Sequence, residues 1–199
     1  AVTVQHLVIV GASWGGLAAL SHFVAAIPQG FPAPIILVQH RSRHGDNLLA
    51  SLLQDATDLR VVDVEDKDVL EAGTVYVAPA NYHLLVDDDH LSLTTDPMVK
   101  FSRPSIDVAF ISAADAYRSR VIGVILTGAN DDGAKGLRRI VNLGGRAIVQ
   151  DPETAEGKAM PTAALRAVPE AEVLALEKIP PRLIELTVPA ERRKSGLSA

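Results

Sequence analysis

"VIVGASWGGLAAL", residues 8–20, decides the fold, because an apolar run leads through a turn of small residues into a helical pattern. Residues 7–10 are all apolar, as in a strand that is buried on both faces of a parallel sheet. Residues 17–26 predict a helix, and residues 35–39 predict a second central strand. Two strands joined by a crossover helix run parallel, so the chain opens with a strand–helix–strand unit.

Short β-rich runs alternate with helical patterns along the rest of the chain. This alternation predicts an α/β fold: a doubly wound, mostly parallel sheet with helices on both faces, in a Rossmann-like three-layer sandwich. Residues 74–95 predict a meander that contains a β-hairpin insertion, with its turn at residues 87–89. Further strands are expected at 60–64, 121–126, 146–150 and 172–176, and further helices within 103–119, 134–145 and 160–167.

The composition indicates one globular domain. The 199 residues include 48% hydrophobic side chains, carry a formal net charge of -5 and contain no cysteine. We expect a domain over residues 1–190 and a charged tail at 191–199. The acidic balance argues against nucleic acid and anionic membranes as partners. The lack of cysteine excludes disulfides, thiolate nucleophiles and Cys-ligated metals, and it fits a reducing, cytoplasmic compartment.

The N-terminal segment has no charged residue before Arg41, which invites comparison with a secretory signal or a membrane span. It lacks the positive region that begins a signal peptide. Glycines and prolines interrupt it before it reaches the length needed to span a bilayer. We therefore expect no membrane insertion and read the segment as buried strand, helix and strand.

The turn at residues 11–16 has three possible meanings. A dinucleotide site requires G-x-G-x-x-G and an acidic residue after the second strand, but Ser13 replaces the middle glycine and the second strand ends in Gln39 and His40. A nucleophile elbow requires G-x-S-x-G, which Gly11, Ser13 and Gly15 supply. In that case the backbone N–H of the following residue faces the developing oxyanion. A tight strand-to-helix connection with an incidental serine remains the third interpretation.

A serine nucleophile needs an imidazole base and a carboxylate that orients it. His40 directly follows the predicted strand at 35–39, and Asp131 and Asp132 follow the predicted strand at 121–126. Because reacting groups in open parallel sheets gather at the carboxyl ends of strands, these residues and Ser13 are expected at one edge. The alternative for either aspartate is a cap on the following helix. The coincidence of three strand ends favours a triad.

Seven stretches resemble, in the same order, the catalytic domain of CheB-type chemotaxis protein-glutamate methylesterases. The resemblance covers residues 7–186, nearly the whole chain. Each stretch alone is modest evidence, but the ordered set is highly specific. The stretches are "VIVGASWGG", "ILVQH", "AGTVYVAPANYHLLV", "RPSIDVAF", "GVILTGANDDGAKGL", "AIVQDPETA" and "AMPTAAL".

The resemblance implies a role for each candidate of the triad. Ser13 is the nucleophile and His40 the general base. The family's aspartate directly precedes a glycine and then a small residue, so Asp132 takes that place and Asp131 does not. The backbone N–H groups of Trp14 and Ala129 are expected to hold the oxyanion.

The implied reaction is hydrolysis of γ-glutamyl methyl esters on the cytoplasmic helices of chemoreceptors, with deamidation of receptor glutamines as a second activity. It requires no metal and no organic cofactor. A receiver domain, in a longer chain or in trans, is a further expected partner. Arg103 and Met160 lie in matching segments and are expected to border the substrate groove; the alternative is a helix-entry arginine and a core methionine.

Two positions depart from the family's pattern. The residue after the nucleophile is usually small, often threonine, and here it is Trp14. The family's loop typically has methionine and then glycine where this chain has Ala129 and Asn130. These departures bear on the oxyanion geometry and on substrate preference. Two alternatives therefore stand beside the esterase: a non-catalytic interaction module of a signalling array, and a Rossmann nucleotide-binding domain.

Overall fold

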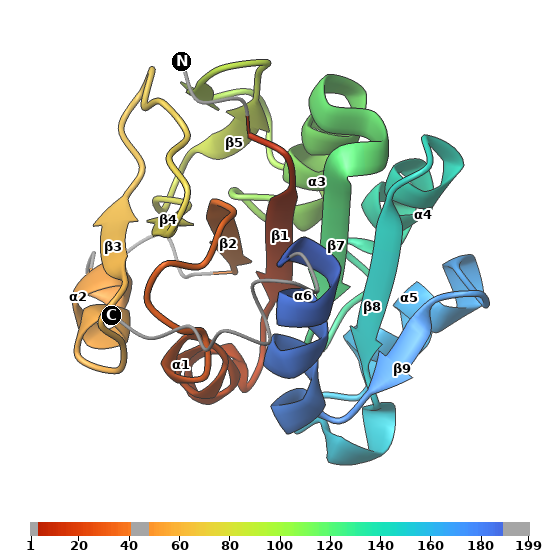
Figure 1. Ribbon diagram of the computed structural model, residues 1–199. Helices are drawn as coiled ribbons and strands as arrows, with labels where there is room; N and C mark the ends of the chain where they lie inside the picture. The colour runs from red at the N-terminus through yellow and green to blue at the C-terminus, as the bar shows by residue number, and fades with distance from the viewer. Residues whose placement is uncertain (1–3, 41–47, 189–199) are drawn as a thin grey trace.

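Three layers make up the domain in the computed structural model, which describes residues 4–40 and 48–188 (Figure 1). The expected tail at 191–199 lies outside these residues. In the described part of the chain a parallel sheet has seven strands in the order β3-β4-β2-β1-β7-β8-β9. In that order the strands are Arg60–Asp63, Thr74–Val77, Ile35–Gln39, Leu7–Ala12, Val121–Ile125, Arg146–Gln150 and Glu172–Leu174. The predicted doubly wound α/β class is confirmed.

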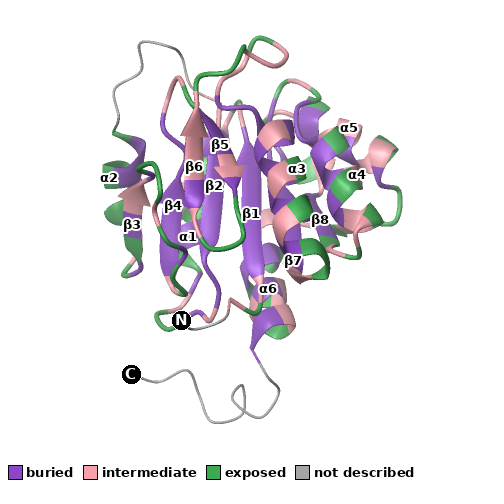
Figure 2. Cartoon of the chain, turned by 90° about the horizontal axis from the view of Figure 1, so that it is seen from above, coloured by how far each residue is buried: buried purple, intermediate pink, exposed green. Residues whose placement is uncertain are grey.

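Helices cover both faces of this sheet. One face packs against α1 (Gly16–Ala25), α2 (Leu49–Gln54) and α6 (Ile179–Thr187). The other packs against α3 (Ile106–Tyr117), α4 (Ala134–Asn142) and α5 (Ala159–Ala167). Figure 1 shows α6 in front of β1 and β7, and Figure 2 shows the buried strands between the outer layers. Short 3₁₀ turns at Arg118–Arg120, Pro152–Thr154 and Leu176–Lys178 complete the described helices.

The alternation of side chains along β1 explains why both faces are apolar. Val8 and Val10 join the cluster on the α1 side, whereas Leu7 and Ile9 join the cluster on the α3 side. All four side chains are fully buried. A strand with two buried faces reads as a continuous apolar run, which is how residues 7–10 appear in the sequence.

The order of the strands reverses at β1, and this reversal positions the site. From β1 the chain crosses to β2 on one side, and it returns later to place β7 on the other side. Ala12 is paired with Gln39, and Gly11 with Ile125. The residues that follow β1, β2 and β7 therefore leave the sheet side by side at the switch point, where open α/β sheets bind ligands.

The expected meander over residues 74–95 is wrong in its first part. β4 joins the main sheet, parallel to β2 and β3, because its four residues are fully buried between two parallel neighbours. The hairpin itself is present: β5 (His83–Val86) pairs antiparallel with β6 (Leu91–Thr94) outside the main sheet. The sequence from 74 to 95 reads as one β-rich run, but Pro79 and the residues after it form a connection between β4 and the hairpin. None of the described helices has the length and apolarity needed to cross a membrane.

Candidate active site

Ser13 lies in the turn between β1 and α1, and backbone hydrogen bonds hold it on both sides. Its N–H donates to the carbonyl of Thr127 at 2.9 Å, and its own carbonyl accepts the N–H of Gly16 at 2.8 Å. Gly15 adopts φ 75°, in the left-handed region that favours glycine. The turn therefore projects Ser13 from the end of the sheet, as the G-x-S-x-G pattern predicted.

Gly16 allows the start of α1 to approach β2. A Cβ on Gly16 would meet the side chain of Gln39, whose Nε2 donates to the carbonyls of Ser13 at 2.9 Å and His40 at 3.1 Å. This amide joins the two turns that carry the serine and the histidine. The glycines of the motif thus have a packing role that does not depend on a bound nucleotide.

Replacing Gly16 with alanine is therefore expected to lower the free energy of unfolding by about 1–3 kcal/mol, because the new methyl group displaces Gln39. Chemical denaturation measures the change. In a double-mutant cycle, Gln39→Ala should relieve the clash, so the two losses should not add. Full additivity would contradict the proposed contact.

His40 follows β2 and shares an open pocket with Ser13. The backbone N–H of His40 donates to the carbonyl of Ala12 at 3.1 Å, and this bond continues the pairing of β1 with β2 beyond the last strand residue. The pocket has a volume of about 580 Å³. Its lining residues are Ser13, Trp14, Gly15, Gly16, Leu17, Ala18, Gln39, His40 and Ala129.

The ring of His40 contacts the predicted carboxylate. Its Nε2 lies 2.6 Å from Oδ2 of Asp132, whose side chain is fully buried. Asp131 instead forms an exposed ion pair with Lys100 at 2.9 Å. The structure therefore brings His40 together with Asp132 and not with Asp131.

Asp132 also accepts hydrogen bonds from the first turn of α3. The backbone N–H of Ile106 donates to Oδ2 at 2.7 Å, the N–H of Asp107 to Oδ1 at 2.9 Å, and the Ser105 hydroxyl to Oδ1 at 3.1 Å. Burial by itself raises the pKa of Asp132. The hydrogen bonds from His40 and from these amides outweigh it and lower that pKa. The carboxylate therefore stays ionised and holds Nε2 of His40 as a donor.

Asp107 makes the reciprocal contact with α4. Its Oδ1 accepts the N–H groups of Gly133 at 3.0 Å and Gly136 at 2.8 Å. Asp132 therefore caps the start of α3, and Asp107, which lies in α3, caps the start of α4. Asp132 does not cap α4, the helix that follows it. Burial raises the pKa of Asp107, and the nearby charge of Asp132 raises it further. Lys100 lies 3.6 Å from Asp107 and partly balances these charges.

Two backbone amides line the pocket as candidate donors to an oxyanion. The N–H groups of Trp14 and Ala129 donate to no other residue within 4–40 and 48–188. The carbonyl of Trp14 accepts the Thr127 hydroxyl at 2.8 Å, and that hydroxyl accepts the N–H of Gly157 at 2.7 Å. These bonds hold the two loops in place around the pocket.

Arg103 and Met160 do not line the pocket that holds Ser13 and His40. Nη1 of Arg103 donates to the carbonyls of Thr95 at 2.8 Å and Asp96 at 3.1 Å. Met160 is 1% exposed and packs against Gly128. These positions match the alternative of a helix-entry arginine and a core methionine, and a role for either in substrate binding stays a prediction.

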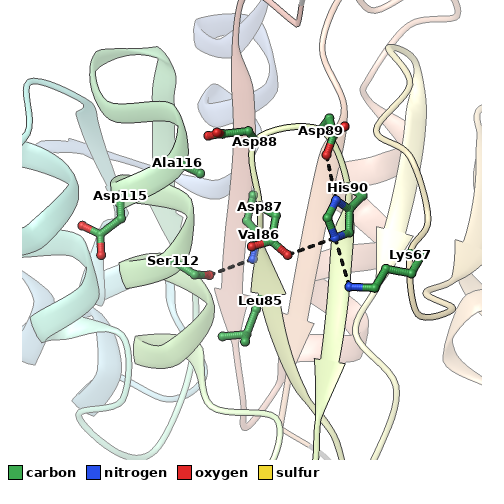
Figure 3. Close-up of a pocket in the computed structure, with 10 residues that line it drawn as sticks. All are labelled: Lys67, Leu85, Val86, Asp87, Asp88, Asp89, His90, Ser112, Asp115 and Ala116. Atoms are coloured by element: carbon green, nitrogen blue, oxygen red, sulfur yellow. Dashed lines mark hydrogen bonds and ion pairs between the residues drawn. The ribbon is translucent and has the colours of Figure 1, made fainter.

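A second hollow lies between α3 and the β5–β6 hairpin (Figure 3). Its polar groups bind one another: His90 pairs with Asp87 and Asp89, and Lys67 approaches the His90 ring at 3.2 Å. The serine that lines it, Ser112, accepts the backbone N–H of Val86 and donates to the carbonyl of Ala109, and in the described part of the chain it does not bond His90. Within the described residues no group of three or more His, Asp and Glu side chains is arranged to hold a metal ion.

Sequence reasoning missed the supporting contacts that surround the candidate triad, which involve Gln39, Lys100, Ser105, Asp107 and Asn130. Only Ser105 carried a usable local signal, because serine before a helix is a common N-cap, and its hydroxyl accepts from Val108. The others act through contacts with residues distant in the chain.

The fold and the site first define a class: an open α/β domain with a serine, an imidazole and a buried carboxylate at the switch point of its sheet. Comparison gives the family. A family model described as CheB methylesterase matches residues 8–183. The chain belongs to the CheB methylesterase family.

Two relatives illustrate different overall lengths. A Leptospira interrogans protein named putative protein-glutamate methylesterase/protein-glutamine glutaminase is 43% identical over 180 residues, covering 90% of this chain and 93% of its own. Protein-glutamate methylesterase FrzG of Myxococcus xanthus is 41% identical over 180 residues, covering 90% of this chain and 54% of its own. The chain therefore spans nearly all of the first relative and about half of the second.

A solved structure supports the same assignment. The crystal structure of the Thermotoga maritima CheB methylesterase catalytic domain matches with a TM-score of 0.88 and 34% sequence identity. The match covers 92% of this chain and 98% of that chain.

Proposed function

We propose that the protein is a serine esterase that hydrolyses γ-glutamyl methyl esters of chemoreceptors, with Ser13, His40 and Asp132 as its catalytic triad. The observation that carries this proposal is the 2.6 Å contact between Asp132 and His40, which lines one pocket together with Ser13. The family and the names of the relatives support the choice of substrate.

Ser13 Oγ attacks the ester carbonyl while His40 takes its proton. Because Nε2 faces the ionised Asp132, the lone pair on Nδ1 accepts this proton. The N–H groups of Trp14 and Ala129 stabilise the oxyanion, and each such donor contributes roughly 3–4 kcal/mol in well-studied enzymes. The protonated ring then gives its proton to the departing methanol. Water, activated by the same nitrogen, releases the glutamate and regenerates the serine.

Membership of the CheB methylesterase family also supports a proposal for the domain, the cofactor requirement and the place of action. We infer that residues 1–190 form the catalytic domain, that the reaction needs no cofactor, and that the protein works in the cytoplasm on the helical segments of chemoreceptors. A receiver domain, in a longer chain or in trans, would regulate it. Relatives named protein-glutamine glutaminase support deamidation of receptor glutamines as a second activity.

Incubation of the protein with methylated receptor membranes tests the proposal. We expect release of methanol, and peptides of the receptor that lose one methylene mass at each modified glutamate. A fluorophosphonate probe should label Ser13 and block the release. Intact esters together with an unlabelled Ser13 would instead favour a non-catalytic interaction module.

Trp14 is expected to determine how tightly the receptor binds. Its side chain is 64% exposed beside the nucleophile, whereas only its backbone serves the oxyanion. Trp14→Thr should therefore raise KM for methylated receptor about tenfold, as for loss of an aromatic contact at an interface, and leave kcat within about twofold. Steady-state kinetics on the receptor and on a small ester measure both effects. Val69→Thr, at an exposed apolar residue away from the pocket, is the control; an equal change in that variant would rule out the assigned contact.

A further inference from the structure

Asn130 lies in the loop between β7 and α4 and contacts the catalytic histidine. Its Oδ1 accepts the backbone N–H of Asp132 at 3.0 Å, and its Nδ2 lies 3.3 Å from Nδ1 of His40. Because an N–H group occupies Oδ1, the amide can only turn its NH₂ end toward the ring. The side chain therefore links the loop that carries the carboxylate to the base.

Asn130 contacts Nδ1 of His40, the ring nitrogen that has to accept the serine proton. Nε2 donates to the ionised Asp132, so the neutral ring has its free lone pair at Nδ1, and Asn130 donates into that lone pair. The hydroxyl of Ser13, by contrast, has no hydrogen-bond partner among residues 4–40 and 48–188. The resting arrangement couples His40 to Asn130 and leaves the nucleophile uncoupled.

We propose that Asn130 is a positioning residue that caps Nδ1 of His40 in the resting site and must rotate away before Ser13 can be deprotonated. This inference rests on the proposed function. Once Nδ1 has taken the serine proton, its N–H faces the NH₂ of Asn130, and two donors repel each other. The same amide thus holds the correct tautomer at rest and opposes the protonated ring during acylation.

The position of Asn130 gives the cap a restraining effect on the empty site. Asn130 is tied to the backbone of Asp132, so its release also loosens the turn before α4. A substrate that fills the pocket beside Ala129 supplies contacts that compensate for this loss. Reactivity of Ser13 in the empty site is therefore lower than the triad alone would give.

Two variants separate this role from a structural one. Asn130→Gly removes the cap, and the rate of labelling by a fluorophosphonate probe should rise about fivefold, the equivalent of one hydrogen bond. Asn130→Asp keeps an oxygen for the N–H of Asp132 but places a second carboxylate oxygen at Nδ1. That oxygen retains a proton on the ring, so labelling at neutral pH should slow about tenfold.

A structural role predicts the opposite pattern: Asn130→Asp labels like the wild type, and Asn130→Gly labels more slowly. That pattern, or equal rates in all three proteins, would overturn the inference. If no protein is labelled, including the wild type, the serine nucleophile itself is refuted and the cap with it. ¹⁵N NMR of wild-type His40 gives a reading independent of variant folding. We expect the proton on Nε2 and a hydrogen-bonded lone pair on Nδ1, and a proton on Nδ1 would contradict the proposal.

Discussion

Ser13→Ala is expected to reduce methanol release from methylated receptor by about 10⁶-fold, to the residual rate that oxyanion binding alone provides. The reason is chemical, since among the described residues Ser13 carries the one hydroxyl that lines the pocket of His40. The substitution removes one hydroxyl oxygen without touching the backbone bonds that hold the turn. Folding and receptor binding should therefore remain close to those of the wild type.

The measurement compares methanol release with receptor binding on the same preparations. Ser51→Ala is a matched control on α2, because among the described residues that serine hydroxyl bonds the carbonyl of Leu48 alone. It should keep full turnover. If Ser13→Ala released methanol at the wild-type rate while remaining folded, the esterase proposal would fail. A clear binding isotherm with NAD or ATP would then revive the nucleotide alternative.

Part of the site could be predicted because it depends only on parallel neighbours. Two buried runs joined by one helix must lie side by side, and the register that pairs Ala12 with Gln39 delivers the next residues, Ser13 and His40, together. The carboxylate follows from the same rule applied to β7, on the other side of β1. Strand ends alone, however, did not distinguish Asp131 from Asp132.

The remainder depends on contacts that no local pattern encodes. Asp132 is buried because the first turn of α3, 25 to 27 residues earlier in the chain, supplies donors to it. Asp107 lies in the first turn of α3, yet its carboxylate caps α4, which follows 27 residues later. The expected meander was wrong for a similar reason, since β4 pairs with β2 and β3 and so belongs to the main sheet.

Asp132 is the residue whose replacement should affect both folding and catalysis. Asp132→Ala leaves the buried N–H groups of Ile106 and Asp107 without their carboxylate acceptor. We expect a loss of about 3–5 kcal/mol in the free energy of unfolding, as for other broken buried pairs. Asp131→Asn, at the exposed neighbour, should change stability by no more than about 0.5 kcal/mol. Denaturant titrations of the two variants test this contrast, and similar losses would contradict it.

Asp132→Asn removes the negative charge of the side chain and keeps its shape, so it shows which of the two catalysis requires. Both oxygens of Asp132 accept N–H donors, so the NH₂ of an asparagine must face one of them. If it faces His40, Nε2 becomes the acceptor, the proton moves to Nδ1, and the ring can no longer take the serine proton. A reduction in kcat of about 10⁴-fold is therefore expected, the size that follows a wrong tautomer in a triad. If the variant kept its turnover while ¹⁵N NMR still placed the proton on Nε2, Asp132 would be a helix cap that happens to lie beside the base.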